Sequence, residues 1–369
     1  MATQPDVIVI GAGLIGCAIS HALSRNGAQV LVLDASAPGS GASQASAGVL
    51  CPHIEAVPDS PLQQLGVASL GLYEQFIARV QRDAGLDVPF VRDGTLETAD
   101  SDEGAAHLAQ LAAQLTAQGV ACTFADGRAL RELEPLVGDT QRAGLLIETH
   151  GAVRVRDLVE ALRVASLAFG TRFLEAERVS QVSTRPGVLL VRTHANRFEA
   201  PHVIVTAGAW SIRLPVDGQP AAPTHPVRGQ LLRLQATAAA MLRRVLWGRE
   251  CYLVPWGDEV LAGATVEDAG FDARATVAGV IQLCSAARAL VPALADATFS
   301  EVRVGLRPGS PDALPMIGAS HRAPGLIYAT GHHRNGALLA PITADLVQRL
   351  VTDPGATIPA AVSPSRFAL

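Results

Sequence analysis

Residues 6–34 read DVIVIGAGLIGCAISHALSRNGAQVLVLD, and this stretch decides the fold. Val7–Ile10 is a continuous apolar run rich in β-branched residues, which predicts a strand buried on both faces. Apolar residues then recur at helical spacing through Leu23, and Gly27 ends the predicted helix. Residues 29–33 predict a second buried strand, so the whole stretch predicts a βαβ unit.

The turn between this first strand and the helix carries a dinucleotide-binding pattern, which comprises Gly11, Ala12, Gly13, Leu14, Ile15 and Gly16. The first glycine allows a tight turn, the second lets the backbone approach a pyrophosphate, and the third allows close packing of helix on strand. The start of the helix offers free N–H groups and a positive dipole end to phosphates. Asp34 ends the second strand, where its carboxylate can accept hydrogen bonds from a ribose, which argues against NADP. The alternative is a purely structural glycine-rich turn.

Composition narrows the class of protein. The chain has 369 residues, 49% of them hydrophobic, which suits one large domain or two joined domains. Its net charge is −5 with no basic block, which disfavours nucleic-acid binding. No apolar run approaches the roughly 18 residues of a membrane span, and the first strand begins too early for a signal peptide. The five cysteines are scattered, which favours the cytoplasm, and no Cys/His cluster indicates a metal site.

The segment after Asp34 distinguishes between nucleotides. Residues 36–50, SAPGSGASQASAGVL, are small, polar and glycine-rich before they turn apolar. Such a loop can lie against a flat ligand, because little side-chain bulk keeps the backbone away. A nicotinamide enzyme of the ordinary Rossmann type would begin its next βα unit here. The loop therefore indicates FAD.

Further along, α/β sections alternate with antiparallel sections. We expect a hairpin over residues 89–98 with its turn at Asp93-Gly94, a helix capped by Asp157, and further helices over 61–84, 102–118, 128–133 and 273–290. Strands are expected over 172–206 and 227–267 and near 144–147, 299–306 and 326–331. The pattern predicts an α/β fold (α+β overall), with a discontinuous, Rossmann-like FAD-binding domain over 1–85, 145–210 and 310–369. A substrate domain built on an antiparallel sheet takes 86–144 and 211–309, and the proline-rich residues 215–223 mark a boundary.

The chain resembles the D-amino-acid oxidase superfamily of FAD-dependent oxidoreductases, and within it the glycine oxidase (ThiO) type. The resemblance spans nearly the whole chain and rests on VIVIGAGLIGCAIS (7–20), SGASQASAGVL (40–50), VIVTAGAWS (203–211), CYLVPWGDEVLAGATVEDAGFD (251–272), GLRPGSPDALPMIG (305–318) and ATGHHRNGALLAP (329–341). It implies non-covalently bound FAD and oxidation of a carbon–nitrogen bond, with hydride transfer to the flavin. It also implies a homo-oligomer.

The matched segments imply a set of FAD contacts. GHHRNG at 331–336 lies between a predicted strand and helix, so its N–H groups can stabilise negative charge on the reduced flavin. An ordinary strand-to-helix turn is the alternative. In full, the implied cofactor residues are Gly11, Ala12, Gly13, Leu14, Ile15, Gly16, Asp34, Ala35, Ala42, Ser43, Ser46, Ala47, Gly48, Val49, Leu50, Val179, Ala207, Gly208, Trp210, Gly331, His332, His333, Arg334, Asn335, Gly336, Ala337 and Leu338.

Three residues are candidates for the catalytic site. Arg307 follows a predicted strand, and an arginine fork is the natural bidentate partner of a carboxylate, although a surface arginine would look the same. Tyr252 can lend its hydroxyl to that carboxylate or pack in the sheet. Arg334 either closes the carboxylate site or only supports its turn. His332 and His333 are expected to act through their backbone, because neighbours in a tight turn cannot both face the substrate.

The substrate-binding candidates also include Val49, Glu250 and Val266. The resemblance would favour a histidine where this chain has Glu250, and a longer side chain than Val266. A carboxylate at residue 250 would attract an ammonium group and favour a different or larger substrate, or else point to solvent. Both departures concern the identity of the substrate rather than the class of reaction.

The resemblance implies oxidation of glycine, sarcosine or small D-amino acids to the imino or 2-oxo acid, with O2 reduced to H2O2, as in thiamine biosynthesis. Such hydride transfer needs orientation more than a general base. One alternative is a dehydrogenase of the same fold, acting on D-amino acids or D-hydroxyproline-like substrates, that passes electrons to a carrier. Another is a non-catalytic FAD-binding module.

Overall fold

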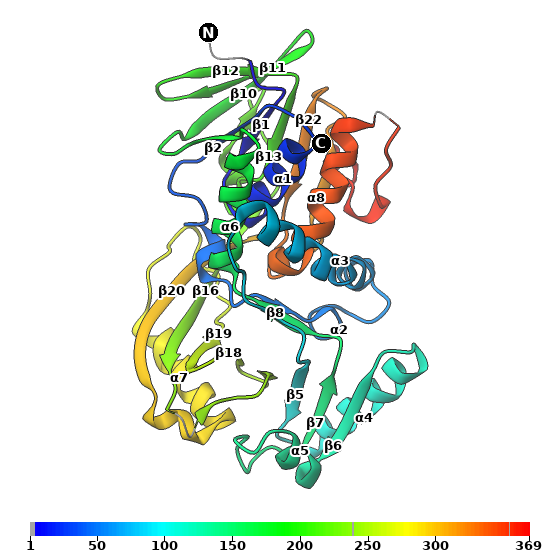
Figure 1. The fold of residues 1–369 in the computed structure, drawn as a ribbon, viewed down its shortest axis with the longest axis vertical. Helices are drawn as coiled ribbons and strands as arrows, with labels where there is room; N and C mark the ends of the chain where they lie inside the picture. The colour runs from blue at the N-terminus through cyan, green and yellow to red at the C-terminus, as the bar shows by residue number, and fades with distance from the viewer. Residues whose placement is uncertain (1–3, 238–239, 354) are drawn as a thin grey trace.

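The computed structural model describes residues 4–237, 240–353 and 355–369. Figure 1 shows two lobes, one above the other. The upper lobe contains a six-stranded sheet with the order β21-β22-β13-β1-β2-β9. The lower lobe contains an eight-stranded sheet with the order β20-β16-β19-β18-β17-β5-β7-β6. The α/β fold class is confirmed.

The predicted βαβ unit forms the centre of the upper lobe. It consists of β1 (Val7–Ile10), α1 (Leu14–Arg25) and β2 (Val30–Leu33). β1 pairs in parallel with β2 and with β13 (His202–Val205), and all four residues of β1 and of β2 are buried. The remaining strands are β9 (Arg172–Leu174), β22 (Leu326–Thr330) and β21 (Met316–Ala319), and the last of these is antiparallel to its neighbour.

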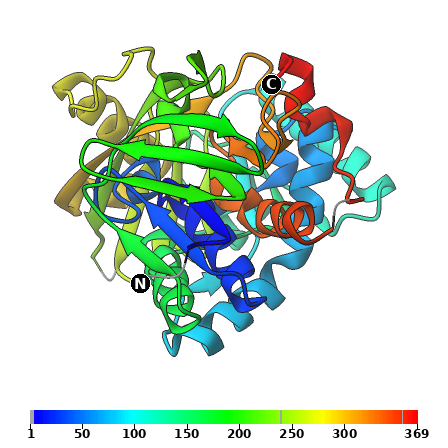
Figure 2. The same cartoon turned by 90° about the horizontal axis from the view of Figure 1, so that it is seen from above.

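Both faces of this sheet are covered, which explains why its strands are continuously apolar. Val7 and Val9 pack against one layer of helices, whereas Ile8 packs against the opposite layer. The helices are α1, α3 (Pro61–Ala84), α6 (Val155–Ala168) and α8 (Gly336–Thr352). The opposite layer is a five-stranded sheet, seen across the six-stranded one in Figure 2, with β12 (Arg197–Ala200), β11 (Val188–Thr193), β10 (Val179–Arg185), β14 (Pro215–Val216) and β15 (Gln219–Pro220).

Two details of the upper lobe differ from the predictions. Asp157 does not cap its helix: the cap residue of α6 is Arg154, and Asp157 lies in the first turn, where its charge still suits the helix dipole. The proline-rich segment forms β14 and β15, which join a sheet of the upper lobe. The proposed domain division itself stays a prediction.

The lower lobe is built on two long strands, β16 (His225–Gln235) and β20 (Thr298–Gly309), which pair antiparallel along their whole length. β20 is longer than predicted, so Arg307 lies within the strand instead of after it. The sheet continues through β19 (Glu259–Gly263), β18 (Tyr252–Trp256), β17 (Val245–Trp247), β5 (Thr95–Ala99), β7 (Ala143–Ile147) and β6 (Cys122–Asp126). Its helices are α4 (Asp102–Ala117), α5 (Gly127–Leu133) and α7 (Val277–Leu290).

The prediction of a hairpin over residues 89–98 is wrong. β4 (Phe90–Val91) pairs with β8 (Gly151–Val153), which also pairs with β3 (Val49–Leu50), and β5 pairs with β7. The segment therefore runs antiparallel to 143–153 as a ribbon that passes from one lobe to the other. Gly94, at φ +79°, bends the chain without reversing it, because the fully buried β7 and β8 offer better partners than a solvent-facing turn.

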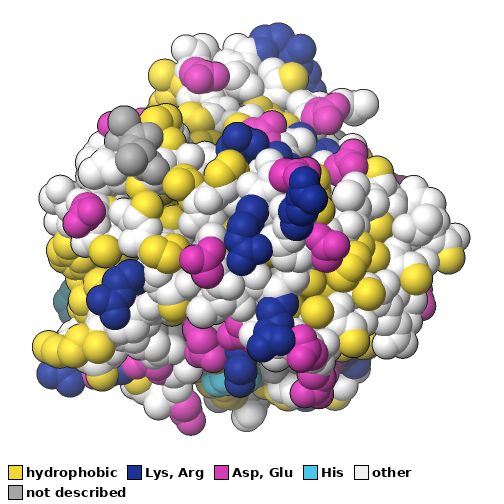
Figure 3. Space-filling view, turned by 90° about the horizontal axis from the view of Figure 1, so that it is seen from below, with side chains coloured by type: hydrophobic (Ala, Val, Ile, Leu, Met, Phe, Trp, Pro, Cys, Tyr) yellow, Lys and Arg dark blue, Asp and Glu magenta, His cyan; other side chains and the backbone are white. Residues whose placement is uncertain are grey.

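Figure 3 shows the lower end of the molecule, where arginine and acidic side chains are interspersed. No helix among the described residues combines the length and apolar character that a membrane crossing requires.

A partly buried carboxylate in β5, that of Glu97, predicts a pH-dependent stability. Glu97 Oε2 has no hydrogen-bond partner among the described residues, and burial raises the pKa of Glu97 from 4.5 to about 7. Because the folded-state pKa lies above the unfolded one, stability falls as the pH rises through this window and stays reduced above it. We expect Glu97→Gln to raise the free energy of unfolding by on the order of 1–3 kcal/mol at about pH 8, with little effect at about pH 4. Urea unfolding at both pH values measures this, and an equal effect at both would assign the change to packing.

Candidate functional site

A cavity of about 500 Å³ lies where the two lobes meet. Its upper wall comes from the β1–α1 turn, the loop after β2 and the turn before α8. Its lower wall comes from β16, β18 and β20, through Gly229, Tyr252 and residues 304–308. The cavity therefore joins the predicted nucleotide end to the predicted substrate end.

At the nucleotide end, the glycines of the β1–α1 turn are sterically required. A Cβ atom on Gly16 would overlap the carbonyl oxygen of Gly11 and lie 2.9 Å from Thr206 Oγ1. Gly11 itself has φ +110°, and its Cβ would lie 2.6 Å from the Thr206 carbonyl oxygen. Thr206 Oγ1 donates to the carbonyls of Ile10 at 2.9 Å and Gly11 at 2.8 Å. The start of α1 is thus pressed against β1 and β13, with Gly13 open to the cavity.

Two polar side chains, those of Asp34 and Ser43, line this end of the cavity. Asp34 Oδ2 accepts from Ala12 N at 2.6 Å and Oδ1 accepts from Ser36 N at 2.8 Å, so the carboxylate is fixed at the end of β2. Burial raises the pKa of Asp34, and these backbone hydrogen bonds oppose that rise. Ser43 Oγ accepts from Leu14 N at 3.0 Å, which occupies one N–H group of the helix start.

The small-residue loop lines the middle of the cavity. Gly48 has φ +76°, and a Cβ there would overlap the carbonyl oxygen of Val153. Val153 N donates to Gly48 O at 2.9 Å, and the loop then enters β3. Small side chains thus let this loop lie between β8 and the cavity, and its contact with a flat ligand stays a prediction.

At the opposite end, glycines make room for Arg307 and Tyr252. The Arg307 guanidinium lies flat on Gly229, where any Cβ would overlap it. The Tyr252 ring lies on Gly263, whose Cβ would be 2.7 Å from the tyrosine hydroxyl, and stacks on Trp247 at 5.0 Å between ring centroids. Burial lowers the pKa of Arg307 and raises that of Tyr252. The phenol therefore stays protonated and available as a donor.

An ion pair between a buried carboxylate and an exposed arginine, not anticipated from the sequence, lies at the same end. Arg334 Nη2 lies 3.2 Å from Glu55 Oε1, and the Arg334 guanidinium stands over the Trp247 ring at 5.8 Å. Glu55 ends the short helix α2 (Pro52–Glu55) and lines the cavity. Burial raises the pKa of Glu55, and the charges of Arg334 and Arg307 oppose this. Because Glu55 and Arg334 are 279 residues apart, no local sequence pattern predicts that they pair.

The two histidines before α8 are neutral. Burial lowers the pKa of His332 to about 3, and its Nε2 contacts Thr343 Oγ1 at 3.0 Å. Burial, then the charges of Arg307 and Arg334, lower the pKa of His333 to about 4. His333 N donates to Pro308 O at 2.9 Å, which ties the turn to β20.

Most of the predicted site residues line the cavity. The lining includes Gly11, Gly13, Leu14, Ile15, Asp34, Ala35, Ala42, Ser43, Ser46, Ala47, Gly48, Val49, Val179, Ala207, Gly208, Trp210, Tyr252, Arg307, His332, His333, Arg334, Gly336 and Ala337. The residues that lie behind this lining are Ala12, Gly16, Leu50, Gly331, Asn335 and Leu338.

Two substrate-binding candidates lie outside the cavity. Glu250 lies in the turn between β17 and β18, its side chain is 64% exposed, and it pairs with Arg249 at 3.6 Å. Val266 is 58% exposed, because the segment after β19 turns this side chain to solvent. Each residue lies close to the site along the chain, but its side chain points away from the cavity.

Comparisons with known proteins agree with this geometry. The family model described as "FAD dependent oxidoreductase" (DAO) matches residues 6–350. The glycine oxidase of Geobacillus kaustophilus is 31% identical over 95% of each chain, and the crystal structure of glycine oxidase from that organism superposes with a TM-score of 0.93 over 98% of this chain and 99% of that one. The bifunctional protein ThiO/ThiG of Synechocystis is 33% identical over 100% of this chain, which spans 55% of that protein.

The fold and cavity thus define an oxidoreductase that binds a flavin dinucleotide. The chain belongs to the DAO family of FAD-dependent oxidoreductases, and its cofactor is FAD. Three features of the structure fit this cofactor. Gly11 and Gly16 let α1 begin close against β1 and β13, α1 presents its N-terminus beside the cavity-lining Gly13, and the cavity reaches from Asp34 to Arg307.

Proposed function

We propose that this protein oxidises the carbon–nitrogen bond of a small amino acid, of the glycine, sarcosine or small D-amino-acid class. The product is an imino acid that hydrolyses to the 2-oxo acid, and O2 is reduced to H2O2. The observation that carries the proposal is that Arg307 faces the cavity without an anionic partner in the described part of the chain. Its guanidinium is half-buried at the cavity wall beside Tyr252, and no carboxylate of the described residues forms an ion pair with it.

The charges at this end suit one carboxylate. Arg307 and Arg334 are cationic, Glu55 is the anion, and the neutral His333 adds no charge, so the balance is one positive charge. A carboxylate bound to the Arg307 fork neutralises it. No excess anion is left for an ammonium group, so the geometry favours the neutral amine, whose lone pair assists removal of hydride from the α-carbon.

We further propose that the cofactor-lining residues named above hold FAD, with its pyrophosphate at Gly11 and Gly13 and its ribose at Asp34. When bound, FAD accepts two electrons from the substrate and is reoxidised by the final acceptor. The protein supplies orientation: Arg307 and Tyr252 hold the acid end, and the Arg334–Glu55 pair limits the room beyond it.

Anaerobic reduction of the flavin tests this function. Glycine, sarcosine, D-alanine, D-proline and the L-enantiomers are added to the oxygen-free holoenzyme, and loss of flavin absorbance is followed for each. We expect the glycine and D-series compounds to bleach the flavin and the L-series to do so more slowly. A holoenzyme bleached by none of these amines would favour the non-catalytic FAD-binding module.

The yield of peroxide decides the electron acceptor. An oxidase forms one H2O2 for each amine oxidised, whereas a dehydrogenase of the same fold forms little and needs an added carrier. Oxygen reactivity depends on access to the flavin, so the substrate panel alone does not separate the two.

The compartment, the oligomeric state and the pathway of the enzyme are also proposals. We propose a cytoplasmic homo-oligomer in which the imino acid serves thiamine synthesis, because relatives carry the name ThiO/ThiG. Light scattering of the purified holoenzyme measures the oligomeric state, and a monomeric mass would overturn that part.

A further inference from the structure

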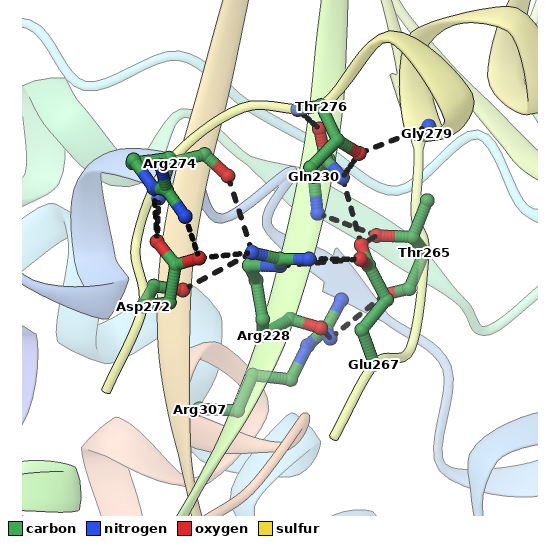
Figure 4. A network of polar contacts seen from close by, with 9 residues as sticks. All are labelled: Arg228, Gln230, Thr265, Glu267, Asp272, Arg274, Thr276, Gly279 and Arg307. Carbon is green, nitrogen blue, oxygen red and sulfur yellow. Dashed lines mark hydrogen bonds and ion pairs between the residues drawn. The ribbon is translucent and has the colours of Figure 1, made fainter. Parts of the chain in front are cut away.

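The orientation of Arg307 depends on two backbone carbonyls. Arg307 Nη1 donates to Thr265 O at 3.0 Å and to Arg228 O at 3.4 Å. The first carbonyl belongs to the segment after β19 and the second to β16, so two separate pieces of chain hold the guanidinium (Figure 4). Whatever fixes these two pieces relative to each other also fixes the fork that faces the cavity.

One carboxylate joins the two pieces. Glu267 Oε2 accepts from Arg228 Nε at 3.1 Å and Nη2 at 2.6 Å. Its other oxygen, Oε1, accepts from Thr265 Oγ1 at 2.5 Å and from Gln230 Nε2 at 2.8 Å. The backbone repeats the link, because Glu267 N donates to Arg228 O at 3.0 Å and Arg228 N donates to Glu267 O at 2.9 Å.

A second layer anchors this carboxylate to α7. Gln230 Nε2 donates to Thr276 Oγ1 at 2.9 Å, and Thr276 N donates to Gln230 Oε1 at 2.9 Å. Thr276 caps α7 by accepting from Gly279 N at 3.2 Å. Figure 4 shows Gln230 of β16 between Glu267 and Thr276, which lies at the start of the helix. Such a closed set of hydrogen bonds leaves little freedom to the groups inside it.

Glu267 also balances a second cation. Arg228 is 7% exposed, and besides Glu267 its guanidinium pairs with Asp272 at 3.3 Å. Burial tends to raise the pKa of Glu267, but hydrogen bonds from Thr265, Gln230 and Arg228 outweigh it and the pKa is lowered. The carboxylate is therefore ionised across the working pH range. Without it, Arg228 would keep Asp272 as its anionic partner but would lose the two side-chain bonds to Glu267 that hold it toward the segment after β19.

We propose that Glu267 is the positioning residue for Arg307, acting through the Thr265 and Arg228 carbonyls, and thereby sets the affinity for the substrate carboxylate. The inference rests on the proposed function for the identity of the substrate. It assigns Glu267 no contact with substrate or cofactor, since Glu267 does not line the cavity.

Glu267→Gln in the holoenzyme tests this, because glutamine keeps the shape but loses the charge and one acceptor oxygen. We expect the apparent KM of the best amine to rise about 10-fold, with kcat changed less than about threefold. We expect Glu267→Asp to recover part of the affinity. The matched control is Glu301→Gln, since Glu301 also accepts from two arginines, Arg303 at 3.0 Å and Arg156 at 3.1 Å, but has no link to Arg307.

Acetate binding separates this inference from the proposed function. Acetate presents only a carboxylate, and its binding is read from the perturbed flavin spectrum without turnover. We expect a Kd about 10-fold weaker in Glu267→Gln and unchanged in Glu301→Gln. If the native holoenzyme oxidises no amine, the proposed function fails, whatever acetate shows.

If native enzyme and Glu267→Gln bind acetate and amine equally well, the positioning role fails alone. If Glu267→Gln and Glu301→Gln both raise KM and lower kcat to the same extent, the role of Glu267 is merely structural. Should Glu267→Gln not yield holoenzyme, Thr265→Val decides. It removes the hydroxyl that bonds Glu267 but keeps the carbonyl that holds Arg307, and unchanged acetate binding in it overturns the proposal.

Discussion

Arg307→Leu is expected to raise the apparent KM for the amino-acid substrate about 10- to 150-fold or more while FAD remains bound, since a charge-assisted bidentate contact contributes on the order of 1.5–3 kcal/mol. Leucine fills much of the space beside Gly229 but cannot pair with a carboxylate. The nucleotide end of the cavity, at Gly11 and Asp34, is untouched. Flavin absorbance of the purified variant measures cofactor content, and steady-state kinetics measure KM.

Two further variants test whether the effect is specific to the Arg307 guanidinium. Arg307→Lys keeps the charge but loses the planar fork, so its KM should lie between those of the native enzyme and Arg307→Leu. Arg303→Leu makes the same change four residues earlier in β20, where the side chain bonds Glu301 and does not line the flavin cavity. We expect its KM to stay within about threefold of native. A native KM in Arg307→Leu would remove Arg307 from the site and with it the proposed substrate class.

The parts of this fold that sequence predicts well are local. Val7–Ile10, the glycines after it and Asp34 lie within one βαβ unit, so periodicity, turn chemistry and spacing all act over short distances. The same is true of the helix over 61–84, whose proline start and glycine end are in the sequence itself.

The errors come from competition between distant partners. Residues 90–91 and 95–99 read as a hairpin because Asp93-Gly94 is a good turn, but the fully buried segments β7 and β8 outcompete that local pairing. The same physics hides the Arg334–Glu55 pair, whose members are 279 residues apart and meet only when α2 and the turn before α8 are packed together. Sequence patterns describe neighbours along the chain, and such contacts are not neighbours.

Side-chain direction is the other limit. Resemblance placed Glu250 and Val266 near the substrate, and both lie within a few residues of cavity-lining Tyr252 or of Thr265. Val266 directly follows Thr265, and successive residues in extended chain point to opposite sides, so its side chain turns to solvent. Glu250 lies in the turn between β17 and β18, where no strand alternation fixes the direction of its side chain. Arg307 and Tyr252 escape this ambiguity because Gly229 and Gly263 leave their side chains flat against the neighbouring strands.

Gly16→Ala is expected to abolish FAD binding and to destabilise the upper lobe. The new Cβ would overlap the Gly11 carbonyl oxygen, and it would lie 2.9 Å from Thr206 Oγ1. Both neighbours are held by the β1–β13 pairing, so α1 must move instead. Overpacking of this kind costs about 1–3 kcal/mol or more. The movement also displaces the N–H groups at the start of α1, where we propose that the phosphates of FAD bind.

The measurements are flavin content after purification, titration with added FAD, and thermal unfolding. Gly71→Ala is the matched control, because Gly71 lies in α3 and the methyl group of an alanine there would have no atom within 4 Å besides its chain neighbours and the backbone of its own helix. That alanine should stabilise the helix by about 0.5–1 kcal/mol and leave FAD bound. A yellow Gly16→Ala protein with native stability would mean that α1 need not contact β1 closely. In that case Gly16 would not be needed for close packing of helix on strand, and the proposal that the cofactor lies at this turn would fail.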